Sequence, residues 1–305
     1  MSSHHEFHHL SYKQHASHFD KERYIEGQKE PLSKAWLAQD TVSAWREDRM
    51  YKALDPIIET EPDAKWLTVG DGIYGKDAKY IFDKGCDVLA TDISDKLLKE
   101  AKDIGYINKF QKENAESLSF EDQEFDYVFC KESYHHFPRP YIALYEMLRV
   151  ASKGVILIEP NDQYIASSFT EILFRNMIDV FRGVFVGKVH KHAFEECGNY
   201  LYRISRRELE KVALGMNYRI VGFKGISDYY QIGSEYEKLS EKGRLYNKIK
   251  SRIYLLDALA KLNLRDYRIL AAIIFKHEPS DALKQNLKKG EYDIINLPKN
   301  PYITR

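Results

Sequence analysis

The sequence has few cysteines and no long apolar run. Three cysteines occur in 305 residues, and Cys86, Cys130 and Cys197 lie far apart. An odd number of widely spaced cysteines is not a disulfide framework, so we expect a reduced, cytoplasmic protein. No apolar stretch approaches the about 20 residues that a membrane-spanning helix needs, so we expect no membrane span.

An excess of charge of either sign is also missing. Lysine plus arginine and aspartate plus glutamate balance at 46 each. This balance points to neither a nucleic acid nor an acidic membrane surface, and we expect no nucleic-acid partner. Six of the eleven histidines lie in residues 1–20, which we interpret as a polar arm. We predict no metal site.

Strands and helices are expected to alternate through the middle of the chain. Helical patterns separate apolar runs that predict strands at residues 65–69, 86–91, 107–111, 125–130, 155–158, 218–223 and 269–275. This alternation predicts an α/β fold with a doubly wound, mostly parallel, Rossmann-like sheet of seven strands.

The rest of the chain is arranged around this sheet. Residues 1–60 are expected to form an arm and a helical lid before a domain at 61–277. Helical insertions are expected at 161–204 and 234–266. Residues 278–305 contain three prolines, which predicts an extended tail.

A glycine-rich turn follows the first expected strand. Gly70, Gly72 and Gly75 satisfy the dinucleotide fingerprint G-x-G-x-x-G, and Asp92 stands 17 residues past Gly75. Glycines let the backbone approach a ligand, and the following helix presents free N–H groups to an anion. The pattern fits the nucleoside of NAD and that of S-adenosylmethionine, so an NAD-dependent oxidoreductase remains an alternative.

Three downstream motifs narrow this choice. The chain reads ENAESLSF at 113–120, FDYVFC at 125–130 and SYHHF at 133–137. With these motifs it resembles the class I S-adenosylmethionine-dependent methyltransferases, especially the small-molecule branch that contains the ubiquinone- and menaquinone-biosynthesis enzymes. The resemblance covers about residues 64–160. It implies that the last strand of the sheet is antiparallel.

The resemblance also implies a cofactor, S-adenosylmethionine, with S-adenosylhomocysteine as product. Asp92 would accept hydrogen bonds from the ribose, although it could instead cap the next helix. The residues that match the family's cofactor-binding positions are Gly70, Asp71, Gly72, Gly75, Asp92, Ile93, Asn114, Ala115 and Lys131.

The sequence departs from the family pattern at two sites that bear on the cofactor. Thr68 stands where the family has an acid in strand one, which leaves Asp71 or Asp77 as candidates for that carboxylate. Asn114 replaces the usual Asp beside the adenine, and it could also be a simple turn residue. A non-catalytic relative is therefore a further alternative.

The candidate catalytic residues follow the fourth strand. Glu132 and His135 lie where loops at the carboxyl ends of strands should project. Methyl transfer to a hydroxyl or ammonium group needs a base, and imidazole titrates near neutrality. We predict His135 as this base. The alternative is that the histidines cap or pack the next helix.

The acceptor is expected to be a small molecule that is methylated on oxygen or nitrogen. A basic stretch at 188–192, with Arg203, Arg206 and Arg207, indicates an anionic acceptor such as a sugar phosphate or nucleotide sugar, or else a solvated face. Tyr229 and Tyr230 follow the penultimate strand, where the family often binds its acceptor. The oligomeric state stays open.

Overall fold

The computed structural model describes most of the chain. The described residues are 10–14, 16–17, 24–163, 170, 172–173, 176–178, 180, 193–195 and 199–303. Residues 1–9 of the histidine-rich arm and much of the insertion expected at 161–204, including 188–192, lie outside them.

One eight-stranded sheet organises the described residues, in the order β3-β2-β1-β4-β5-β7-β6-β8. Strands β1 to β5 run parallel, β7 runs antiparallel to β5 and β6, and β8 runs antiparallel to β6. The strands are β1 (Lys65–Val69), β2 (Asp87–Asp92), β3 (Phe110–Lys112), β4 (Phe125–Lys131), β5 (Ala151–Pro160), β6 (Ile220–Ile226), β7 (Ile269–Phe275) and β8 (Asp293–Asn296). The predicted doubly wound, mostly parallel class is confirmed.

The eighth strand comes from residues 278–305, for which an extended tail was predicted. Ser280 caps a helix there by accepting a backbone hydrogen bond at 3.2 Å, and β8 follows the helix. The prolines lie outside both elements, with Pro279 before them and Pro298 and Pro301 after them. The prolines flank the helix and the strand and do not interrupt them, so the prediction of an extended tail was wrong.

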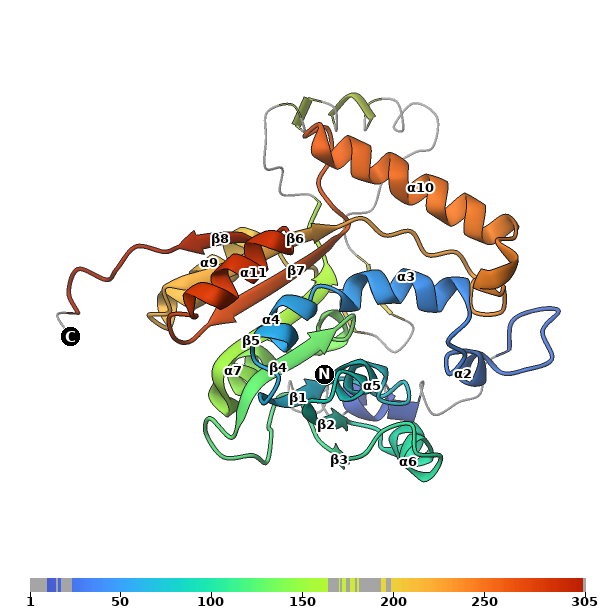
Figure 1. The fold of residues 1–305 in the computed structure, drawn as a ribbon, viewed down its shortest axis with the longest axis horizontal. Helices are drawn as coiled ribbons and strands as arrows, with labels where there is room; N and C mark the ends of the chain where they lie inside the picture. The colour runs from blue at the N-terminus through green and yellow to red at the C-terminus, as the bar shows by residue number, and fades with distance from the viewer. Residues whose placement is uncertain are drawn as a thin grey trace, which may run out of the picture.

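Helices cover both faces of the sheet (Figure 1). Buried side chains of α4, α5, α6 and α11 form one apolar layer with the sheet, and those of α7 and α9 form the other. The helices are α2 (Leu32–Ala35), α3 (Val42–Tyr51), α4 (Asp55–Thr60), α5 (Lys76–Asp83), α6 (Lys96–Asp103), α7 (Pro140–Val150), α9 (Arg206–Gly215), α10 (Arg244–Lys261) and α11 (Asp281–Lys289). None of these described helices is long and apolar enough to cross a membrane.

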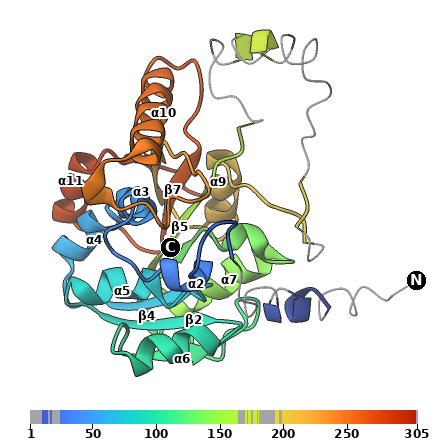
Figure 2. The ribbon, with the colours of Figure 1, turned by 90° about the vertical axis from the view of Figure 1, so that its right-hand side faces the viewer.

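Helix α3 joins the sheet to the accessory helix α10. Met50 and Tyr51, at the end of α3, are buried in one of the two sheet layers. At its start, Val42 packs against Ile249 and Ile253 of α10. Figures 1 and 2 both show α3 between α10 and α5. The helix is thus anchored in the core on one side and forms a wall over the end of the sheet on the other.

The order of the strands reverses between β1 and β4. Successive strands leave this point in opposite directions, which opens a crevice at their carboxyl ends. In open α/β sheets ligands bind in this crevice. A ligand is therefore expected to bind beside the residues that follow β1 and β4.

Candidate functional site

A cavity of about 660 Å³ lies at the switch point. Its volume falls within the range of cofactor sites, about 300–1,000 Å³. Ten of the eleven predicted site residues line it: Gly70, Asp71, Gly72, Asp92, Ile93, Asn114, Ala115, Lys131, Glu132 and His135. The fold therefore brings together residues that are up to 65 positions apart in the chain, from Gly70 to His135, and only Gly75 of the predicted set does not line the cavity.

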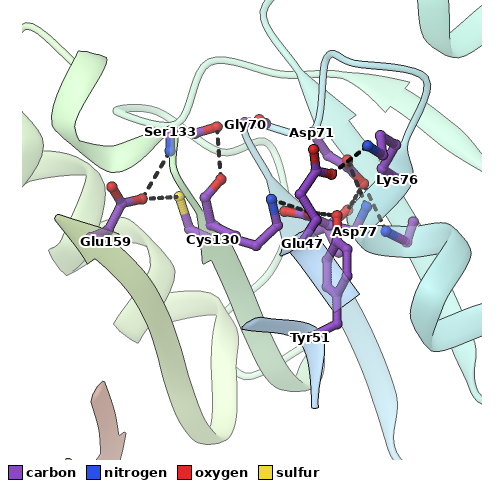
Figure 3. Close-up of polar contacts among 12 residues, drawn as sticks. Glu47, Tyr51, Gly70, Asp71, Lys76, Asp77, Cys130, Ser133 and Glu159 are labelled. Carbon is purple, nitrogen blue, oxygen red and sulfur yellow. Dashed lines mark hydrogen bonds and ion pairs between the residues drawn. The ribbon is translucent and has the colours of Figure 1, made fainter. Parts of the chain in front are cut away.

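Two glycines of the turn are approached closely by other groups. Gly70 has a φ of +78°, and a Cβ there would lie 2.5 Å from the Cβ of Ser133. The Ser133 hydroxyl donates a hydrogen bond to the Gly70 carbonyl at 2.6 Å (Figure 3). A Cβ at Gly72 would lie 2.7 Å from the Cγ of Asp92. Only glycine lets the turn lie against both neighbours.

The side chain of Asp71 caps helix α5 from within the turn (Figure 3). Its carboxylate accepts hydrogen bonds from the amides of Asp77 at 3.0 Å and Ala78 at 2.8 Å. The Thr68 hydroxyl donates a third, at 2.9 Å. Burial, together with the neighbouring Asp77 carboxylate, raises the pKa of Asp71 well above its usual value. The hydrogen bonds of the Asp71 carboxylate are thus made within the protein, where it serves as the cap of α5.

This cap argues against a dinucleotide. A dinucleotide places its pyrophosphate on the free N–H groups of this helix. Here Asp71 already accepts from two of them, and its charge when ionised would repel a phosphate. Gly75 begins the helix with a φ of +66°, and a Cβ there would lie 3.0 Å from the Ile107 side chain. Its role is packing, so the fingerprint glycines do not serve a pyrophosphate.

Charged side chains from α3, α5 and β4 meet beside the turn. Glu47 forms an ion pair with Lys76. The ammonium group of Lys131 lies 3.5 Å from Asp77 and 4.9 Å from the ring centroid of Tyr51. The Tyr51 hydroxyl donates to the same Asp77 oxygen at 2.8 Å. Asp77, a predicted candidate for the cofactor's amino group, is therefore already held by two partners.

Glu47 brings a carboxylate to the cavity that the sequence analysis missed. Burial would raise its pKa, but Lys76, Lys131 and Arg46 outweigh burial and lower it to about 2. Glu47 is therefore ionised across the physiological range. It lies on α3, outside the segment that resembles the family, and no motif marks it.

The predicted ribose and adenine residues also shape their own turns. An Asp92 oxygen accepts the Ser94 amide at 2.8 Å, and the Asn114 side-chain oxygen accepts the Glu116 amide at 3.0 Å. Both residues line the cavity as well. The turn role foreseen as the alternative for Asn114 is therefore present, whereas Asp92 does not cap α6, which has no side-chain cap hydrogen bond. The two hydrogen bonds fix these side chains at the cavity wall.

His135 is held by a buried carboxylate that ends β5. Its Nδ1 lies 2.6 Å from the Oε2 of Glu159, which is 0% exposed. The other Glu159 oxygen accepts the amides of Ser133 and Tyr134, each at 2.9 Å. This arrangement leaves Nε2 as the ring nitrogen for a substrate. Glu159 was noticeable in the sequence only as an acid at the end of an apolar strand.

Burial would lower the pKa of His135, but the charge and hydrogen bond of Glu159 outweigh it and raise the pKa above 6.5. The neighbouring His136 is turned elsewhere, with its Nδ1 2.7 Å from Glu195. Glu132 adds a carboxylate to the cavity and has a φ of +48°, which is uncommon outside glycine and often marks functional sites. The pair His135–Glu159 is therefore suited to remove a proton.

Three of the basic residues predicted to bind an anionic acceptor, Arg203, Arg206 and Arg207, lie in the described part of the chain, and none of them lines the cavity. Arg206 pairs with Asp293, and Arg207 pairs with Glu210, both on the surface. Tyr229 and Tyr230 do line the cavity. Nine carboxylate side chains line it against four cationic ones, counted over the described residues. The cavity therefore has an acidic character, which suits a cationic cofactor better than a pyrophosphate.

Comparisons with known proteins agree with this geometry. Residues 67–158 match the family model of a methyltransferase domain. The 2-methyl-6-phytyl-1,4-hydroquinone methyltransferase of Synechocystis is 31% identical over 127 residues, which are 39% of this chain and 40% of the relative. The match thus spans well under two thirds of that relative.

Several solved methyltransferases have a similar fold at low identity. One from Archaeoglobus fulgidus is 14% identical with a TM-score of 0.48, over 79% of this chain and 99% of that one. The magnesium protoporphyrin IX methyltransferase of Synechocystis, solved with bound S-adenosylhomocysteine, is 12% identical with a TM-score of 0.43, over 88% and 95%. The domain match and the ordered motifs around the cavity indicate a methyltransferase domain over residues 67–158.

Proposed function

We propose that the protein transfers a methyl group from S-adenosylmethionine to an oxygen or nitrogen atom of a small-molecule acceptor. The observation that carries this proposal is the His135–Glu159 pair at the wall of the cavity. Small-molecule acceptors are also named for the relatives described above, a hydroquinone and a porphyrin. The acidic cavity and the capped helix favour this cofactor over NAD.

The residues at the cavity fit the cofactor. Asp92 and Gly72 would lie at the ribose, and Asn114 and Ala115 at the adenine. The ionised carboxylate of Glu47 lies at the cavity wall, and beside its ion pair with Lys76 it could also accept from the cofactor's ammonium group. When bound, S-adenosylmethionine supplies a methyl group activated on a sulfonium.

The chain's own part in the reaction is to hold the acceptor in line and to take its proton. Glu159 is fixed by two backbone amides, and it fixes Nδ1 of His135 in turn. The neutral imidazole then accepts a proton at Nε2, and Glu159 stabilises the imidazolium that forms. A positioned base of this kind contributes about 10²–10⁴-fold to the rate.

A crystal structure with S-adenosylhomocysteine tests the proposal. We expect the adenosine to lie along Asp92 and Asn114, with the sulfur on the side of His135. The imidazole should face the position of the missing methyl group. A bound nucleoside whose sulfur faces away from His135 would contradict the assignment of the base.

A further inference from the structure

One wall of the cavity is made by α3 and the segment 227–235 that follows β6. The two are joined by a backbone hydrogen bond from the Ser43 amide to the Ser234 carbonyl at 3.0 Å, and the Arg49 guanidinium donates to the Ser227 carbonyl at 2.8 Å. Arg46 of α3 forms an ion pair with Asp228, and their side chains are 7% and 10% exposed. Both line the cavity. The wall is thus a fixed part of the fold, and it carries buried charge.

The charges of this wall do not balance. Arg46 lies close enough to Asp228, Glu132 and Glu47 for all three carboxylates to raise its pKa, although burial alone would lower it. Glu47 already has Lys76 as its partner. The Arg46 guanidinium therefore serves both Asp228 and Glu132. Glu132 also lies close enough to Lys131 to raise the pKa of that lysine. Glu235, which is 2% exposed, adds another carboxylate to the same side of the cavity.

Buried atoms of the wall also lack hydrogen bonds. Among the described residues, no partner exists for the Nε of Arg46 or for the Oδ1 of Asp228. The hydroxyls of Ser227 and Ser234 also lack a partner, but these two residues do not line the cavity. A buried polar atom without a partner is destabilising, so the Nε of Arg46 and the Oδ1 of Asp228 at the cavity wall point to a ligand that completes them. A protonated amine would give Asp228 the donor it lacks and would balance the excess charge.

Charges elsewhere around the cavity do not remove this excess. Lys76 and Lys131 are engaged with Glu47 and Asp77. Arg268 is exposed where it lines the cavity, so water weakens its field. S-adenosylmethionine brings a single net positive charge, whereas Asp228, Glu132 and Glu235 together exceed Arg46 by two. An excess of negative charge therefore remains after the cofactor is bound, and a cationic acceptor would compensate it.

We infer that the acceptor carries a protonated amine that is bound at Asp228, with its apolar or aromatic body against Tyr229 and Tyr230. This inference rests on the proposed function and narrows its acceptor to a cationic small molecule. A guanidinium already lies over each ring, Arg46 at 5.3 Å from the centroid of Tyr230 and Arg252 at 5.9 Å from that of Tyr229. The apolar body of the acceptor would therefore pack against the remaining surface of the two rings. The anionic acceptor predicted from the basic residues would meet uncompensated carboxylates here.

Three probes of one shape test the inference. They are 2-phenylethylamine, 2-phenylethanol and phenylacetate, whose end groups are cationic, neutral and anionic at neutral pH. Each is titrated into protein saturated with S-adenosylhomocysteine, at low salt and up to about 10 mM, since ligands this small bind weakly. We expect the amine to bind at least about tenfold more tightly than the other two, a difference of about 1.4 kcal/mol.

Asp228→Asn removes the charge but keeps the shape, and it should reduce the preference for the amine to less than about threefold. The matched control is Glu210→Gln on the surface of α9, which should leave the preference unchanged. If Asp228→Asn does not fold, the relative affinities of the three probes for the wild-type protein still test the inference.

Equal or tighter binding of the alcohol or the acid would overturn the inference, and so would no detectable binding of the amine. If S-adenosylhomocysteine itself binds in that experiment, the proposed function stands and only the acceptor class is wrong. If it does not bind, the proposed function fails as well.

Discussion

Replacing Glu159 by glutamine should change the proton affinity and the tautomer of His135. The glutamine oxygen can still accept the amides of Ser133 and Tyr134, so the loop after β4 keeps its anchors. Its NH2 group then faces Nδ1 of His135, which becomes an acceptor, and the proton moves to Nε2. Hydrogen bonds to charged groups contribute about 1.5–3 kcal/mol, so protonation of His135 should weaken about 10- to 100-fold.

The assay is an NMR titration of the histidine side chains, which needs no acceptor. His135 is assigned from a His135→Asn variant. In the wild type it should titrate above 6.5, because Glu159 favours the charged imidazolium. In Glu159→Gln it should titrate below 6.5, because burial then acts without the carboxylate. A wild-type His135 that titrates at or below 6.5, or the same pKa in both proteins, would refute the reasoning.

The same pair links stability to pH. The folded-state pKa of His135 is raised, so the stability it contributes is complete below the unfolded pKa of about 6.5. It is lost as the pH rises through the folded pKa. The difference in unfolding free energy between wild type and Glu159→Gln should therefore be larger at pH 6 than at pH 9. An equal difference at both pH values would exclude this linkage.

Two further substitutions test the cofactor end of the cavity. Asp92→Ala should weaken calorimetric binding of S-adenosylhomocysteine by about 1–3 kcal/mol, because a buried hydrogen-bond partner is lost; unchanged affinity in a folded variant would rule out the ribose role. Gly70→Ala combines a left-handed backbone with a clash against Ser133 and should lower the unfolding free energy by about 2–4 kcal/mol in urea denaturation. Its control is Gly85→Ala, where φ is +91° but no atom lies within 4 Å, so only the backbone cost of about 1–2 kcal/mol should appear. Equal losses for the two glycines would show that the contact with Ser133 does not matter.

The sheet and the cofactor end of the cavity were predictable from the sequence because local patterns encode them. Apolar runs marked the parallel strands, and each predicted residue after β1, β2 or β4 lies at a strand end. Parallel topology then brings these ends to one edge of the sheet. Gly75 does not line the cavity, because a pattern of letters does not distinguish a glycine that packs against Ile107 from one that faces a ligand.

The cavity wall proposed to bind the acceptor was not predictable in the same way. Arg46 and Asp228 are 182 residues apart in the chain and carry no motif, and only the packing of α3 against the segment after β6 brings them together. The role of Asp71 as the cap of α5 was not predictable either, because the sequence shows an acid in a glycine turn but not where its oxygens point. Long-range packing decides both cases.

The glycine turn from which Asp71 caps α5 should bind S-adenosylmethionine and not a dinucleotide. Calorimetric titration of the protein with S-adenosylhomocysteine and, separately, with NADH tests this directly. We predict saturable binding of S-adenosylhomocysteine at one site per chain and no measurable binding of NADH. Binding of NADH without binding of S-adenosylhomocysteine would contradict the account.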